Sequence, residues 1–72
     1  MRTEEVLNYL KYCLDLAKKI YKKYGQDQQR ICEAIGMLKV CQNIAFALGY
    51  TELAMECYKW KNILLKRLTE KN

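Results

Sequence analysis

The chain has 72 residues, which is enough for one domain, and we expect residues 1–72 to form a single helical domain. It is 51% hydrophobic, carries a formal net charge of +5 and contains no histidine. The apolar content excludes intrinsic disorder, and the missing histidine removes the usual general base and the commonest metal ligand. No apolar run approaches the ~20 residues of a membrane span, so we expect no membrane partner.

Two glycines divide this proline-free chain into three periodic segments. Gly25 and Gly49 each follow a long periodic run, where a helix typically ends with a glycine in the left-handed conformation. The predicted helices span about residues 4–24, 28–48 and 52–69. Because the connections are short, consecutive helices should be antiparallel neighbours. The sequence therefore predicts an all-α fold, a three-helix antiparallel up-down-up bundle.

The first segment carries one apolar seam. Thr3 is the predicted N-cap, and Glu4 and Glu5 suit the positive end of the helix dipole. Apolar residues then recur at alternating spacings of four and three, which is the pattern of a helix packed along one side. The seam consists of Val6, Leu10, Cys13, Ala17, Ile20 and Tyr24.

The second segment, with Asp27 as its predicted N-cap, is apolar on more than one side. One seam contains Ile31, Ala34, Leu38, Cys41, Ala45 and Leu48. A second apolar set contains Cys32, Ile35, Met37, Val40, Ile44 and Phe46. A helix that is apolar all round must be covered on most sides. We therefore expect this helix to be central and to dimerise with a second copy through its second face, and we expect Gly36 to permit a close helix–helix approach.

The third segment has Thr51 as its predicted N-cap and a single seam. The seam contains Leu53, Cys57, Trp60, Leu64 and Leu68. Polar residues fill most of the remaining positions. This segment is therefore predicted to cover one side of the central helix.

Basic residues gather toward the ends of the first and third segments. In the predicted topology these ends meet the N-terminus of the second helix, whose dipole adds positive potential. Candidate contacts for an anion or an acidic partner are Lys18, Lys19, Lys22, Lys23, Arg30, Lys66 and Arg67. Such an end suits phosphate, nucleic acid or an acidic protein surface. The competing interpretation is that acid-first, base-last charge only stabilises each helix.

Aromatic and aliphatic residues outside the seams are the candidates for a protein interface. Half-exposed tyrosines are favoured at interfaces, since one end of the side chain is apolar and the other is wet. The candidate interface residues are Tyr9, Tyr12, Met37, Val40, Ile44, Phe46 and Tyr58. The alternatives are that the tyrosines cover the edges of a small core or stack on bases.

The four cysteines, at positions 13, 32, 41 and 57, do not predict a disulfide framework or a metal site. Three of them lie on apolar helical positions, and no two have the spacing of a metal-binding pair. We interpret them as reduced thiols that act as small hydrophobic residues in a cytoplasmic protein. No cofactor is expected, and a thiol without a histidine base makes an enzyme the least favoured class.

These patterns favour a non-enzymatic interaction module, such as an adaptor, regulator or inhibitor, that self-associates through its central helix. The alternative is a small, basic, dimeric regulator that binds nucleic acid through the lysine-rich end of the bundle.

Overall fold

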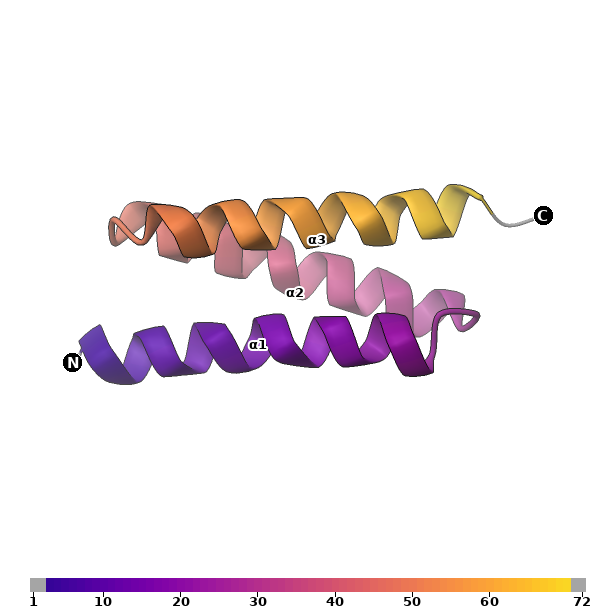
Figure 1. Ribbon diagram of the computed structural model, residues 1–72, viewed down its shortest axis with the longest axis horizontal. Helices are drawn as coiled ribbons and strands as arrows, with labels where there is room; N and C mark the ends of the chain where they lie inside the picture. The colour runs from indigo at the N-terminus through magenta and orange to yellow at the C-terminus, as the bar shows by residue number, and fades with distance from the viewer. Residues whose placement is uncertain (1–2, 71–72) are drawn as a thin grey trace.

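The computed structural model describes residues 3–70, which form three helices joined by two short turns (Figure 1). Helix α1 spans Thr3–Lys23, α2 spans Gln28–Ala47 and α3 spans Thr51–Thr69. Consecutive helices run in opposite directions, so the predicted all-α, up-down-up bundle is confirmed (Figure 1). The molecule is elongated, with principal extents of 43 × 17 × 14 Å. In the part of the chain described here, no helix is long and apolar enough to cross a membrane.

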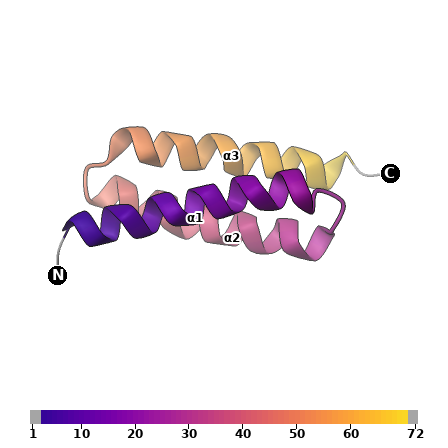
Figure 2. The ribbon, with the colours of Figure 1, turned by 60° about the horizontal axis from the view of Figure 1, so that its bottom comes forward.

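Helix α2 is the central element. It packs against both neighbours, and its contact with α3 is more extensive than its contact with α1 (Figures 1 and 2). Helices α1 and α3 touch one another much less. The buried core draws on all three helices and contains Leu10, Cys13, Leu14, Ala17, Ile31, Ala34, Leu38, Cys41, Ala45, Ala54, Cys57 and Leu64. Five of the six residues of the predicted α2 seam are in this core, while Leu48 is exposed.

The turn between α2 and α3 closes as predicted. Gly49 has a φ of +86°, the left-handed conformation that only glycine adopts at little cost. Its backbone N–H donates to the carbonyl of Phe46 at 3.1 Å, and the N–H of Tyr50 donates to the carbonyl of Ala45 at 2.8 Å. These are the two hydrogen bonds of a Schellman motif, which satisfies carbonyls at the helix end.

The turn between α1 and α2 differs from the prediction. Gly25 is not in the left-handed conformation, so that prediction is wrong. Space accounts for this glycine instead, because a Cβ atom would lie 2.8 Å from the carbonyl oxygen of Tyr21 and 3.0 Å from Nη2 of Arg67. Asp27 is the N-cap of α2, as predicted, and its carboxylate accepts a hydrogen bond of 3.2 Å from the backbone N–H of Arg30.

The remaining corrections concern the predicted helix starts and Gly36. Helix α3 already includes Thr51, so the capping position belongs to Tyr50, and α1 already includes Thr3. Gly36 is exposed, and a Cβ atom there would meet nothing within 4 Å. The expected close approach to another helix of the same chain is therefore wrong, and α2 turns this glycine outward.

Candidate interaction surfaces

A contact between two thiols shows how α1 and α2 are aligned along their common axis. The buried side chains of Cys13 and Cys41 share a hydrogen bond. At the end of the same pair of helices, the guanidinium of Arg30 lies 4.1 Å from the ring centroid of Tyr24, the residue that follows α1. Both contacts fit the same antiparallel register, in which the two residue numbers at one height add up to 54. Position 12 of α1 therefore lies level with position 42 of α2.

Two tyrosines and three aliphatic side chains lie along the outer side of this helix pair. A hydrogen bond with Cys13 is the main cause that raises the pKa of Tyr9, and Cys41 of α2 is also among its neighbours, so the ring lies on the side of α1 next to α2. Its ring centroid is 6.5 Å from that of Tyr12. On α2, Met37 and Ile44 lie one turn before and after Cys41, and Val40 lies beside them. We call this surface the α1/α2 face; it consists of Tyr9, Tyr12, Met37, Val40 and Ile44.

Most of this face is accessible to solvent. Tyr9 is 62% exposed, Tyr12 60% and Val40 57%, while Ile44 is 39% exposed. Only Met37 is half-buried against the core. The structure thus brings together five of the seven candidate interface residues.

The other two candidates lie elsewhere. Phe46, 73% exposed, follows Ile44 by two positions, and helical residues two apart point to opposite sides. On α3, Trp60 packs edge-on against Tyr21 of α1 at 5.6 Å between ring centroids, so the side of α3 that carries Trp60 faces α1. Tyr58, two positions earlier, points away from α1. Neither residue belongs to the α1/α2 face.

The basic end of the bundle forms as the topology requires. The last turns of α1 and α3 and the first turn of α2 lie at one end of the molecule (Figures 1 and 2). Exposed cations at that end are Lys22, Lys23, Arg30 and Lys66. Lys19 is also exposed but lies farther from the end along α1.

Two of the predicted basic candidates are engaged in contacts between α1 and α3. Nζ of Lys18 is 3.7 Å from a carboxylate oxygen of Glu56 and lies 5.8 Å from the ring centroid of Trp60, so this lysine links α1 to α3. Arg67 lies over the ring of Tyr21 at 5.5 Å. Arg30, although exposed, pairs with Asp27 at 3.3 Å. The field at this end is consequently weaker than the count of basic residues indicates.

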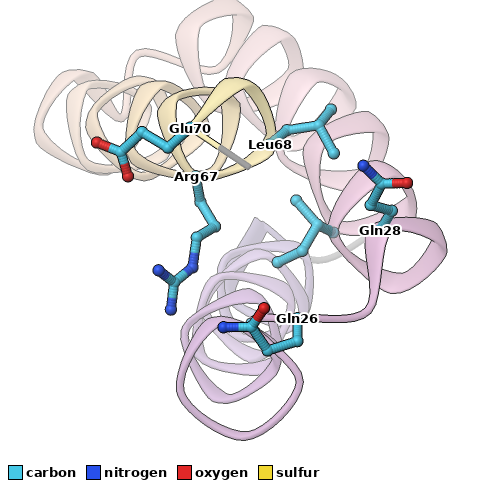
Figure 3. Close-up of a pocket in the computed structure, with 7 residues that line it drawn as sticks. Gln26, Gln28, Arg67, Leu68 and Glu70 are labelled. Atoms are coloured by element: carbon cyan, nitrogen blue, oxygen red, sulfur yellow. The ribbon is translucent and has the colours of Figure 1, made fainter. Parts of the chain in front are cut away.

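A small cavity opens at the same end, between α3 and the turn from α1 to α2 (Figure 3). Its volume is about 310 Å³. Arg67 reaches from α3 toward the turn that carries Gln26, and Gln28 approaches from the first turn of α2. The Nε atom of Arg67 is buried and has no hydrogen-bond partner, while Glu70 adds negative charge to the rim. The sequence analysis named Arg67 as a candidate contact for an anion or an acidic partner, but only the tertiary structure shows that it shares a cavity with Gln26 and Gln28.

The cysteines divide into one exposed and three buried thiols. Cys32 is exposed, whereas Cys13, Cys41 and Cys57 lie in the core, one from each helix. Burial and the hydrogen bond with Cys13 raise the pKa of Cys41 to about 12, and burial also raises the pKa of Cys57. The thiols of Cys41 and Cys57 therefore remain protonated at neutral pH, as expected for cysteines that act as small hydrophobic residues.

Among residues 3–70, no group of three or more histidine, cysteine, aspartate or glutamate side chains is arranged to hold a metal ion. Comparison with known proteins adds no family: no family model, curated protein or solved structure matches the chain. The functional argument therefore depends on the surfaces described above.

Proposed function

We propose that this protein is a small, non-enzymatic interaction module of the cytoplasm that self-associates through α2 and acts by binding other protein. The observation that carries the proposal is the exposure of Tyr9, Tyr12 and Val40, each more than half accessible. Exposed hydrophobic residues that form one contiguous patch, rather than lying singly, are typical of interaction sites.

The energetics favour association. A chain of this size buries only ~60% of the surface of its unfolded state and is marginal as a monomer. Full burial of an exposed aliphatic side chain contributes ~1.5–3 kcal/mol, and the partly exposed Val40 and Ile44 would each gain a fraction of this. The rings of Tyr9 and Tyr12 add area and keep their hydroxyl groups at the wet rim. A dimer would therefore gain stability from side chains that the monomer leaves in water.

Sedimentation equilibrium of the purified protein tests self-association. The monomer mass is 8.6 kDa, and we expect twice this mass at micromolar concentrations and a return to the monomer on dilution. A folded monomer throughout the micromolar range would contradict self-association. The native mass in a lysate of the source cell then tests for additional partners.

The second candidate function is nucleic-acid binding at the basic end. It is supported by the convergence of Lys22, Lys23 and Lys66 with the positive end of the α2 dipole. Phosphate contacts would make the affinity fall steeply with salt concentration. Replacing these three lysines by glutamine should abolish such binding, whereas Lys11→Gln and Lys59→Gln, remote from this end, should leave it unchanged. Binding that is indifferent to salt would exclude this function.

A further inference from the structure

We propose that two copies pair through the α1/α2 face, with α1 antiparallel to α1 of the partner and α2 antiparallel to α2 of the partner. The two-fold axis lies in the interface, runs perpendicular to the helices, and is level with Tyr12. This inference rests on the proposed self-association and adds its geometry: the partner is a second copy, α1 shares the interface with α2, and the two basic ends point in opposite directions.

The order of side chains along α1 supports this axis. The first turn carries Glu4 and Glu5, the aromatic pair follows, and Lys19 lies as far beyond Tyr12 as Glu5 lies before it. An antiparallel pair centred on Tyr12 therefore sets the acidic first turn of each copy at the height of Lys19 of the partner. Opposite charges at one height are favourable, and the two tyrosine rings meet at the centre.

The order along α2 leads independently to the same centre. Val40 and Ile44 lie equally far on either side of Gln42. The same axis therefore places Val40 of each copy against Ile44 of the partner. Apolar groups are then covered by apolar groups, which is the larger energetic term at an interface. The register set by the thiols of Cys13 and Cys41 places position 42 at the height of Tyr12. One axis therefore satisfies both helices.

The competing arrangement has its two-fold axis parallel to the helices. That arrangement would cover the same apolar groups, but it would bring Lys22, Lys23 and Lys66 of both copies to one end. Like charges within a Debye length, ~8 Å at physiological ionic strength, repel one another. In the antiparallel arrangement these ends are separated by much of the 43 Å length of the molecule. Charge therefore selects between two arrangements that are similar in their apolar contacts.

Disulfide trapping tests the geometry. In a Cys32→Ser background, which removes the exposed native thiol, Tyr12→Cys should form a covalent dimer under mild oxidation, because the two copies of position 12 meet at the axis. Lys59→Cys in the same background is the control, since this exposed position on α3 lies away from the face. The axis parallel to the helices would instead cross-link a Tyr12→Cys chain to a Val40→Cys chain.

A second pair of variants tests which side of α2 is covered. Val40→Lys should raise the dissociation constant of the dimer about 100-fold. In a symmetric dimer this substitution removes one buried valine from each copy, and so two from the interface. Phe46→Lys, on a side of α2 outside the α1/α2 face, should change the dissociation constant by less than about 3-fold. A dimer that survives Val40→Lys, or in which Tyr12→Cys fails to cross-link, would overturn this geometry and leave self-association intact. A monomer at every concentration would overturn both.

Discussion

Gly25 and Arg67 are 42 positions apart in the chain and in contact in the fold: a Cβ atom on the glycine would lie 3.0 Å from Nη2 and 3.3 Å from Nε of the arginine. The guanidinium also lies 5.5 Å from the ring centroid of Tyr21. The turn between α1 and α2 is thereby joined to the last turns of α3. This contact closes the basic end of the bundle and forms part of the wall of its cavity.

Gly25→Ala should therefore destabilise the protein. The new methyl group would lie 2.8 Å from the backbone oxygen of Tyr21, which cannot move without shifting the end of α1. Overpacking of this kind costs ~1–3 kcal/mol. Thermal unfolding followed by circular dichroism measures the change, at ~4–8 °C per kcal/mol for a domain of this size.

Gly36→Ala is the matched control for this substitution. It adds the same methyl group inside α2, where nothing lies within 4 Å of the new atom. Alanine is favoured over glycine in a helix interior by ~0.8–1 kcal/mol, so this variant should be more stable than the parent protein. Equal destabilisation by both substitutions would show that the space around Gly25 is not what requires a glycine there.

Alkaline pH should weaken the core through Cys41. The folded-state pKa of its thiol is about 12, above the ordinary value of 9.0 that applies to the unfolded chain. Because the folded state holds this proton more tightly, its contribution is complete below pH 9 and is lost as the pH rises from 9 toward 12. Urea unfolding at several pH values should show this decline. The decline should be shallower in Cys41→Ala, which lacks the titrating group while the lysines and tyrosines remain.

Alkylation should distinguish the four thiols at neutral pH. Thiolates are the reactive species, and only Cys32 is exposed. A maleimide should therefore modify one cysteine per chain rapidly, and the other three only at the rate of unfolding. Mass spectrometry with peptide mapping would identify the site. Fast modification of Cys13, Cys41 or Cys57 would mean that the core opens more readily than its packing indicates.

Most of the fold could be predicted from helical periodicity, because each helix has one strong apolar seam that becomes its buried side. The buried positions of α2 from Ile31 to Ala45 follow the predicted seam. The second apolar set of α2 could be recognised from the sequence as more than the core of one chain needs. Three of its members, Val40, Ile44 and Phe46, are exposed. Which of these share a surface depends on where α1 lies, and the spacing within α2 holds no information on that point. Spacing does separate Phe46 from Ile44, because helical residues two apart point to opposite sides, whereas the place of Tyr58 depends on which side of α3 faces α1.

The basic end illustrates a different limit. Helix order alone predicted that the lysine-rich ends of α1 and α3 would meet, and they do (Figure 1). It did not predict that Lys18 pairs with Glu56 or that Arg67 packs on Tyr21. Such pairings depend on the rotation of each helix about its own axis, which is set by core packing across all three helices.

Asp27 and Thr51 looked equivalent in the sequence, since each is a good capping residue ahead of an apolar run, but the structure separates them. The carboxylate of Asp27 accepts a hydrogen bond from the N–H of Arg30, whereas Thr51 lies inside the first turn of α3. Asp27→Ala should therefore cost ~0.5–2 kcal/mol, because it leaves an N–H of α2 without its acceptor. Thr51→Ala should change stability by less than about 0.5 kcal/mol.

Asp27→Asn separates the cap from the ion pair with Arg30. Asparagine caps a helix about as well as aspartate, so this variant loses only the charge interaction, whose atoms are 3.3 Å apart on exposed side chains. Exposed pairs of this kind contribute ~0–1 kcal/mol. Urea unfolding of the three variants should thus place Asp27→Asn close to the parent protein and Asp27→Ala well below it. If Asp27→Asn were as unstable as Asp27→Ala, the charge of Asp27 rather than its capping hydrogen bond would be what stabilises the start of α2.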